Sequence, residues 1–264
     1  MSDRHDDDPL DDGDGIPDYA WLARYLRIPG ARFVRTPSYE LLADGVEEAC
    51  EDLGITVAYG NPGAGKTFAL HVAIANRCRL PVTWLEPEHR PTLLALTEQL
   101  LYALGEHDLV GQRRVLVRPL IRLLGIPRLV VVDEAQRLTA ECIDHLRYLS
   151  DRSDTNFALA LAGGVHCMEV LNTEPQLARR CPLKVEFTHL DREEIQEYMP
   201  RYHPMYVSLE RRLLNRIDDE YAHGMIGLWA NMTKRLHKEL DRGGETEVNE
   251  EMIEAAFVRL DATG

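Results

Sequence analysis

Residues 60–67 read Gly-Asn-Pro-Gly-Ala-Gly-Lys-Thr, a complete phosphate-binding loop of the form G-x-x-x-x-G-K-T. The loop follows an apolar, β-branched stretch, Ile55–Tyr59, and precedes a helix-like stretch, Phe68–Ala75. Strand, glycine loop and helix are the context that this motif requires. The glycines let backbone N–H groups turn toward an anionic phosphate, and the N-terminus of the following helix adds partial positive charge. The sequence therefore predicts a nucleoside triphosphate site.

The residues of this loop have separate expected roles. Lys66 would reach the β- and γ-phosphates, which makes it a candidate catalytic residue, and the Thr67 hydroxyl would bind Mg²⁺. A chance glycine turn is the alternative, and the flanking strand and helix argue against it. The residues expected to contact the nucleotide are Gly60, Asn61, Pro62, Gly63, Ala64, Gly65, Lys66, Thr67 and Phe68.

A second motif supplies two carboxylates. Residues 128–134 read Arg-Leu-Val-Val-Val-Asp-Glu, and such an apolar run is typical of a parallel strand covered on both faces. Ligands of open α/β sheets bind at the carboxyl ends of such strands. We expect Asp133 to hold the Mg²⁺ shell and Glu134 to polarise the attacking water as general base. An acidic helix cap is the alternative interpretation. With the phosphate loop, the pair predicts an enzyme that hydrolyses ATP, with ATP and Mg²⁺ as cofactors.

The composition describes a chain able to bury one substantial core, because 45% of its 264 residues are hydrophobic. No stretch resembles a signal peptide, and no apolar run approaches the length of a membrane span. We therefore expect a cytoplasmic protein without a membrane partner. The five cysteines include no C-x-x-C spacing and are expected to be buried, reduced thiols rather than a zinc site or a disulfide framework.

The acidic charge is concentrated at the N-terminus. Of the net charge of −14, residues 1–20 carry −7, from eight aspartates and one arginine. This leader has no apolar period and is expected to be disordered. It is interpreted as a solvating tail or as a mimic of nucleic acid that covers a basic face of the same chain. The overall acidity argues only weakly against nucleic-acid binding, because a local basic face can outweigh net charge.

Strands and helices alternate along the middle of the chain. Pro119 predicts a kink or a late start in one of the helices. The alternation predicts a parallel sheet flanked by helices and joined by right-handed crossovers. Strands are expected at 55–59, 82–85, 128–132, 156–162 and 184–187, and helices at 21–26, 38–50 capped by Ser38, 91–104 opening at Pro91, 112–124 and 140–149.

No strand is expected after Asp191, where helices are predicted at about 191–198, 208–222, 225–240 and 248–259. The fold class is therefore α/β, a P-loop NTPase with a parallel sheet flanked by helices and a C-terminal helical lid. The expected domains are an acidic leader at 1–20, an α/β nucleotide-binding domain at 21–190 and a helical lid subdomain at 191–264.

Beyond the two motifs, several stretches carry a family resemblance: Arg32–Thr36, Tyr59–Thr67, Val132–Leu138, Leu146–Asp151, Leu159–Gly164 and Leu177–Arg180. With the order of the parts, they resemble AAA+ ATPases, and in particular the bacterial transposition ATPases of the Mu B, TnsC and TniB type. The similarity covers roughly residues 32–240. ExeA-type secretion ATPases share a similar Asp-Glu-Ala-Gln block.

The resemblance implies an ATP-switched assembly factor. Such proteins oligomerise with ATP as rings or filaments, bind duplex DNA with little sequence preference and present it to a partner transposase, and ATP turnover then releases the assembly. An arginine from one subunit would touch the γ-phosphate held by the next. Arg180 matches that catalytic position best and Arg179 second, whereas a helix-capping role is the alternative for both.

Two departures from the family pattern predict slow hydrolysis. The end of the fourth strand usually carries a polar sensor side chain, but this chain has Gly163 and Gly164. In the family, the lid often carries an arginine shortly after a glycine. In this chain the first basic residues after Gly224 are Lys234 and Arg235, one of which could take that role. We expect turnover below about 10 per second, a typical enzyme value.

A basic segment is the candidate DNA contact. Arg114, Arg118 and Arg122 recur every four residues and would share one face of a helix, with Arg113 beside them. Such a stripe could follow duplex phosphates. The alternative is a solvated face paired with nearby acids. A weaker basic cluster is formed by Lys234, Arg235 and Lys238.

Two classes of function remain open at this point. The transposition-like blocks favour a regulator that captures target DNA and activates a transposase. The acidic leader and acidic bulk favour an ATP-switched signalling or secretion-type scaffold that binds protein and not DNA. Kinase chemistry is compatible with any phosphate loop, but Glu134 beside the Mg²⁺ carboxylate favours water as the acceptor.

Overall fold

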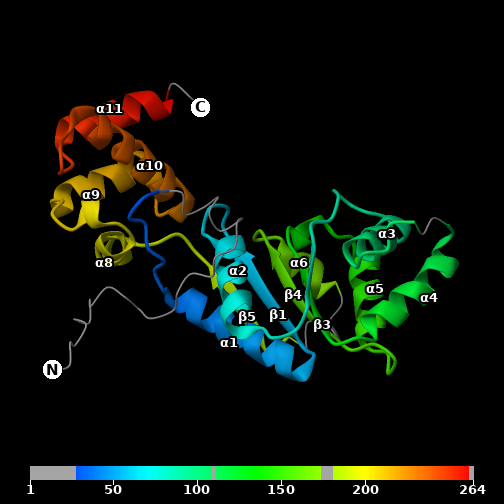
Figure 1. Ribbon diagram of the computed structural model, residues 1–264. Helices are drawn as coiled ribbons and strands as arrows, with labels where there is room; N and C mark the ends of the chain where they lie inside the picture. The colour runs from blue at the N-terminus through cyan, green and yellow to red at the C-terminus, as the bar shows by residue number, and fades with distance from the viewer. Residues whose placement is uncertain (1–27, 109–110, 174–180, 262–264) are drawn as a thin grey trace, which may run out of the picture. The chain divides into compact units, whose positions relative to one another are not determined.

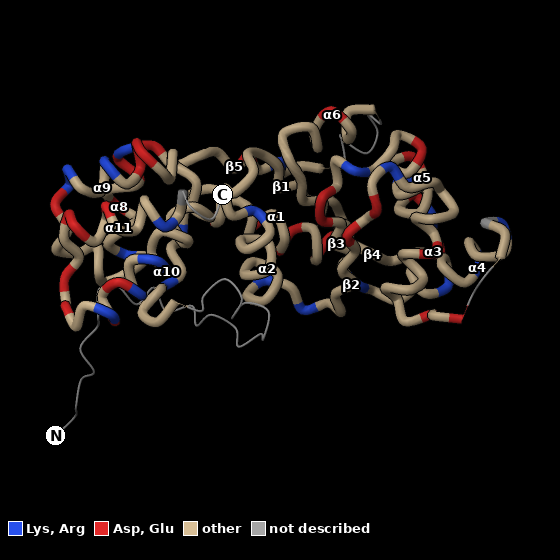
Figure 2. The backbone as a smooth tube through the Cα atoms, turned by 90° about the horizontal axis from the view of Figure 1, so that it is seen from above, with Lys and Arg blue, Asp and Glu red and all other residues tan. Residues whose placement is uncertain are grey.

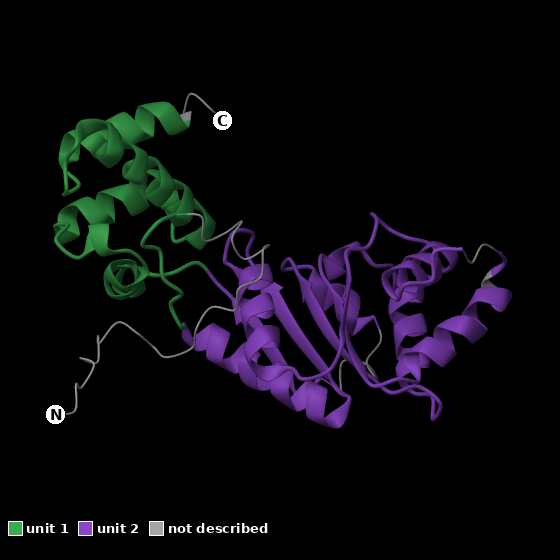
Figure 3. Cartoon of the chain, in the orientation of Figure 1, with its two compact units in different colours: residues 1–35, 189–264 green, residues 36–188 purple. Residues whose placement is uncertain are grey.

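The computed structural model describes residues 28–108, 111–173 and 181–261 (Figure 1). The predicted leader, the predicted helix at 21–26, Arg179 and Arg180 lie outside these ranges. The described residues form two compact units, one of residues 36–188 and one of residues 28–35 with 189–261 (Figure 3). Each unit is described separately.

The first unit is built on a parallel sheet of five strands in the order β2-β3-β4-β1-β5. All five expected strands are confirmed, each within one residue of its predicted ends. Neighbours that are not consecutive in sequence require crossover connections, which the intervening helices provide. The strands are β1 (Ile55–Gly60), β2 (Val82–Leu85), β3 (Arg128–Val132), β4 (Phe157–Gly163) and β5 (Leu183–Phe187).

The helices of this unit differ from expectation mainly at their ends. Thr36, not Ser38, caps the first helix, because its hydroxyl accepts the Tyr39 N–H and a proline follows it at the first helical position. Ser38 instead donates to the Glu186 carbonyl at 3.2 Å. The helices are α1 (Pro37–Asp52), α2 (Lys66–Arg77), α3 (Leu93–Ala103), α4 (Arg113–Leu124), α5 (Ala140–Ser150) and α6 (Cys167–Asn172).

Three further differences concern proline and short elements. Thr92 caps α3, so the helix begins after Pro91 and not at it. Helix α4 starts at Arg113 and continues through Pro119, so the prediction of a late start, at the proline, was wrong. The 3₁₀ turn η2 (Ala135–Arg137) and helix α6 were not expected from the sequence.

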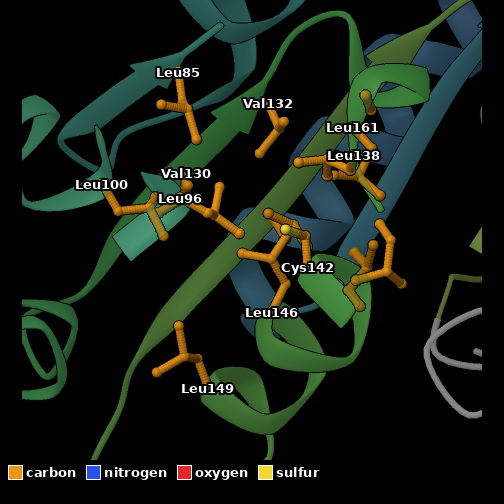
Figure 4. Close-up of a cluster of buried hydrophobic side chains, with 14 of the residues drawn as sticks. Leu85, Leu96, Leu100, Val130, Val132, Leu138, Cys142, Leu146, Leu149 and Leu161 are labelled. Carbon is orange, nitrogen blue, oxygen red and sulfur yellow. The ribbon is translucent and has the colours of Figure 1, made fainter. Parts of the chain in front are cut away.

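The core explains why the strands read as continuous apolar runs. Strand register places Val57, Val130, Val132, Leu159 and Leu161 on one face of the sheet. This face packs on leucines of α3, α4 and α5 in one buried cluster. Figure 4 labels leucines of α3 and α5 beside Val130, Val132 and Leu161 of the sheet. The opposite face of β1 and β4 carries small side chains, among them alanines 58, 160 and 162, and α1 and α2 contact these strands. Both faces are therefore buried.

All five cysteines are free thiols, as expected. Three of them, Cys142, Cys167 and Cys181, are buried. The expectation of burial was wrong for Cys50 and Cys78, which are only partly buried and whose sulfurs lie 3.0 Å apart between the ends of α1 and α2. Among the described residues, no three or more His, Cys, Asp or Glu side chains are grouped to bind a metal.

The second unit is helical, as predicted, around a core that includes the fully buried Tyr206 and Trp229. The helix expected at 208–222 begins at Arg211 and continues from Asp218 as a π-helical turn, in which the His223 N–H donates to the Asp218 carbonyl. The Asp218 side chain accepts the Gly224 N–H and the Trp229 indole N–H. The elements are α8 (Arg192–Tyr202), η3 (Pro204–Tyr206), α9 (Arg211–Ile217), η4 (Asp218–Ala222), α10 (Ile226–Gly243) and α11 (Glu250–Asp261).

Residues 28–35 belong to this helical unit and not to the nucleotide-binding unit in which residues 21–190 were expected. The Arg32 N–H donates to the Tyr202 carbonyl at 2.7 Å, and His203 Nε2 lies 2.8 Å from the Pro29 carbonyl oxygen. Neither this unit nor the sheet-containing one has, over its described residues, a helix long and apolar enough to cross a membrane.

Candidate nucleotide-binding site

The phosphate loop joins the end of β1 to the start of α2, as its sequence predicts. Gly60 has φ of 134°, and a Cβ there would lie 2.0 Å from the Phe187 carbonyl oxygen of β5. The Asn61 N–H donates to that same oxygen at 3.0 Å. The loop is therefore attached to the edge of the sheet where strands β1 and β5 both end.

The N-terminus of α2 is suited to an anion. Its N-cap is Gly65, with φ of 87°, a conformation that glycine adopts without strain and that supplies no side-chain cap. The first amides of the helix are thus available to phosphate oxygens, and the helix dipole favours negative charge at the same place. Thr67 and Phe68, both partly buried, lie in this first turn.

Lys66 lies over the inside of the loop. Its ammonium donates to the carbonyls of Gly60 at 3.0 Å and Asn61 at 2.7 Å. Burial lowers the pKa of Lys66, and the negative charges of Glu134 and Asp133 act in the opposite direction. Phosphate oxygens would compensate the cost of burying this ammonium, so the residue fits the role predicted for it.

Asp133 and Thr67 meet at the carboxyl end of β3. The Thr67 hydroxyl donates to Asp133 Oδ2 at 3.1 Å, and the Asp133 N–H continues the ladder to the Leu85 carbonyl at 2.9 Å. Burial raises the pKa of Asp133, while hydrogen bonds from Glu134 and Thr67 lower it. A cation beside this carboxylate would favour its charged form.

These two oxygens fit Mg²⁺ better than a metal that needs a complete protein cage. The ion commonly takes one or two protein ligands and completes its shell with phosphate oxygens and water. Thr67 and Asp133 supply a hydroxyl and a carboxylate within hydrogen-bond distance of each other, next to the phosphate loop. The donor set is therefore appropriate for Mg²⁺ bound together with a nucleotide.

Glu134 follows in an unusual backbone conformation, with φ of 55° and ψ of 37°. A non-glycine residue in this left-handed region costs about 1–2 kcal/mol, so its surroundings must hold it. Its N–H donates to Asp133 Oδ1 at 2.8 Å, and Arg137 Nη2 lies 3.9 Å from its Oε2. These two contacts hold the turn that follows β3.

A glutamine that the sequence did not single out as functional also contacts Glu134. Gln136 Nε2 donates to Glu134 Oε2 at 2.5 Å, and its Oε1 accepts the Gly164 N–H at 2.8 Å. Gln136 therefore lies beside the end of β4, where related ATPases usually carry a polar sensor side chain and this chain has Gly163 and Gly164. The available signal was the Asp-Glu-Ala-Gln block itself, read together with Gly163-Gly164.

The predicted arginine stripe lies on α4, where Figure 2 colours Lys and Arg residues blue along the backbone. Arg114, Arg118 and Arg122 are exposed, and their helical spacing places them opposite the buried Leu116 and Leu120. Arg122 lies 3.8 Å from Glu106, a weak surface pair. The backbone of Arg113 begins the helix, whereas its side chain lies outside the described part. The structure therefore confirms the shared face but does not test DNA binding.

Comparison with protein families and solved structures defines the fold. A family model described as an AAA domain matches residues 50–171. Aeropyrum pernix ORC2, in ADPNP and ADP complexes, is similar with a TM-score of 0.64 at 18% identity, covering 87% of this chain and 68% of that one. A Thermotoga maritima RuvB variant gives a TM-score of 0.58 at 17% identity, covering 84% and 69%. At these identities the likeness establishes the fold alone, and that fold is AAA+.

Two curated proteins are similar in sequence, and both are named ATP-dependent target DNA activator B. The protein of Escherichia phage D108 is 30% identical over 173 residues, covering 61% of this chain and 55% of the relative. The protein of Escherichia phage Mu is 32% identical over 148 residues, covering 54% and 46%. The chain spans about half the length of these relatives.

Proposed function

We propose that this chain, an AAA+ protein distantly homologous to the target DNA activator B proteins of phages Mu and D108, is an ATPase that captures target DNA for transposition. With ATP it would assemble on duplex DNA and recruit and activate a partner transposase, and slow hydrolysis would release the assembly. The homology carries the transposition part of this proposal. The phosphate loop beside Asp133 and Glu134 carries the ATPase part.

In this proposal, hydrolysis uses residues that follow β1 and residues that follow β3, two strands that end at the same edge of the sheet with β4 between them. Lys66 and the amides of the first turn of α2 bind the phosphates, and Thr67 and Asp133 hold Mg²⁺. The bound ion would neutralise charge on the β- and γ-phosphates. Glu134 accepts a proton from the attacking water, because a carboxylate one residue beyond the metal ligand can reach a water beside the γ-phosphate.

We also propose that the functional unit is a homo-oligomer, ring or filament, in which Arg180 of one subunit completes the site of the next. Arg180→Ala is expected to lower turnover by about 1,000-fold or more, the usual effect of losing an arginine finger, while ATP binding persists. Phosphate release and binding of a fluorescent ATP analogue measure the two quantities. Arg179→Ala tests the second candidate for this position in the same assays.

A mixture of inactive variants tests whether this arginine acts between subunits. Arg180→Ala retains an intact phosphate loop, and Lys66→Ala retains the arginine. Mixed oligomers would contain some complete sites, so turnover should reappear on mixing. If both variants are inactive and their mixture stays inactive, the arginine does not act between subunits. If Arg180→Ala alone keeps full turnover, the arginine has no role in hydrolysis.

DNA binding distinguishes this function from the alternative, an ATP-switched scaffold that binds only protein. The acidity of the chain favours that alternative. We expect tight, salt-sensitive binding of a random duplex with ATP or a slowly hydrolysed analogue, and weak binding with ADP. Fluorescence anisotropy over a salt series measures it. If the chain binds no DNA in any nucleotide state, the DNA-binding function is wrong and the protein-binding scaffold is the better interpretation.

The arginine stripe of α4 gives this DNA prediction a residue-level test. Arg114→Glu with Arg118→Glu should weaken binding at least tenfold and make the slope of log affinity against log salt shallower by about two, since each phosphate contact contributes about one. Arg79→Glu with Arg211→Glu is a charge-matched control, because both arginines are exposed and neither lies on α4. Equal DNA affinities in the two double variants would show that the arginines of α4 do not bind DNA.

A further inference from the structure

The side-chain amide of Gln136 connects the catalytic carboxylate to the end of the neighbouring strand. Its nitrogen donates to Glu134 Oε2 at 2.5 Å, and its oxygen accepts the Gly164 N–H at 2.8 Å. The two partners have opposite character, a carboxylate and an N–H, so only one orientation of the amide satisfies both. Gln136 is therefore held at both ends.

The backbone of β4 leaves space for this amide. A Cβ on Gly163 would lie 2.4 Å from Gln136 Oε1 and 2.9 Å from Cys167 Cβ. Strands β3 and β4 are parallel neighbours with Val132 opposite Leu161, so the segments that follow them emerge at the same sheet edge. Gln136 can therefore occupy this position only because Gly163 has no side chain.

Glu134 needs a contact of this kind. Its left-handed backbone costs about 1–2 kcal/mol, and its side chain is partly exposed, so the carboxylate would otherwise sample several directions. Both polar contacts to the carboxylate from the described residues, those of Gln136 and Arg137, go to Oε2. Oε1 is then the oxygen that accepts the proton from water.

We propose that Gln136 is a positioning residue for hydrolysis, holding Glu134 in its reactive direction and coupling it to the end of β4 in place of a sensor side chain. This inference rests on the proposed ATPase function. Gln136 acts through Glu134 and not on the nucleotide. Its loss should therefore reduce kcat and leave ATP affinity unchanged.

Two substitutions and one control test the contact between Gln136 and Glu134. Gln136→Ala removes both hydrogen bonds, and kcat should fall about 10- to 100-fold while KM for ATP stays within about threefold, because only transition-state geometry is lost. Gly163→Ala should cause a similar loss with Gln136 still present, since the new methyl group displaces the amide. Gln196→Ala is the matched control, because that glutamine also makes a side-chain hydrogen bond, to Asn215 at 3.0 Å in the helical unit.

A double-mutant cycle separates positioning from stability. In the Glu134→Gln background, Gln136→Ala should cause no further loss of single-turnover rate, because the group it positions no longer acts as a base. A merely structural role would lower the melting temperature and reduce the rate in both backgrounds. Additive losses, or a kcat for Gln136→Ala within twofold of the native chain, would overturn the proposal.

The same cycle distinguishes the failure of this inference from the failure of the proposed function. If Glu134→Gln hydrolyses ATP at the native rate, the assignment of the base fails, and the positioning role fails with it. If Glu134→Gln is inactive and Gln136→Ala is fully active, only the positioning role is lost.

Discussion

Glu134→Gln should reduce ATP turnover by about 100- to 10,000-fold, the range expected when a general base is removed. Glutamine has nearly the same size and shape as glutamate but cannot accept the proton from water. It can still accept the hydrogen bond from Gln136, so the turn after β3 should persist. The variant is therefore expected to bind ATP and remain in the ATP-bound state.

The measurement pairs single-turnover phosphate release with binding of a fluorescent ATP analogue, whose affinity should stay within about threefold because binding and catalysis use different groups. Glu86→Gln is the matched control. Glu86 lies at the same sheet edge and contacts Arg137 at 2.8 Å, but it does not follow the metal ligand. It should keep turnover within a few-fold of the native chain. Equal losses in the two variants would mean that general negative charge, and not a specific base, supports hydrolysis.

Glu134→Gln also connects hydrolysis to assembly. If ATP turnover releases the protein from DNA, a chain that retains ATP should remain bound to duplex long after the native chain has dissociated. The same anisotropy assay, followed over time after addition of competitor duplex, would show this. Release at the native rate would indicate that dissociation does not depend on hydrolysis.

The site was predictable where a short motif determines it. The phosphate loop and all five strands follow from local patterns. The central strands β1, β3 and β4 are continuous apolar runs because both of their faces are buried, whereas the edge strand β5 alternates buried and exposed residues. The start of the first helix is also encoded locally, because Thr36 followed by Pro37 is a stronger start signal than Ser38.

The remaining features depend on contacts between distant segments. Gln136 reaches Gly164 only because β3 and β4 are neighbours in a particular register, which no local pattern specifies. Likewise, the Asp218 side chain accepts hydrogen bonds from Gly224 and from the indole of Trp229, eleven residues further along the chain. Such contacts are visible only once the fold brings the segments together.

Gly60→Ala should produce the largest loss of stability among the substitutions considered, above about 4 kcal/mol, a range reserved for severe steric or polar defects. The added Cβ would lie 2.0 Å from the Phe187 carbonyl oxygen, and φ is 134°. Phe187 is the register partner of Gly60, so relief requires the ends of β1 and β5 to separate. The Asn61 N–H bond to Phe187 and the contact of Lys66 with the Gly60 carbonyl would be lost together.

Gly105→Ala separates this collision from backbone strain. Gly105 also has positive φ, 93°, but nothing lies within 4 Å of a Cβ placed there. It should cost only about 1–2 kcal/mol, the penalty of a left-handed residue with a side chain. Thermal unfolding with and without ATP measures both variants. The Gly105 variant should keep the rise in melting temperature that bound nucleotide causes, because its loop is intact. The Gly60 variant should lose that rise along with its stability, and similar behaviour of the two would show that the approach of β5 does not restrict this loop.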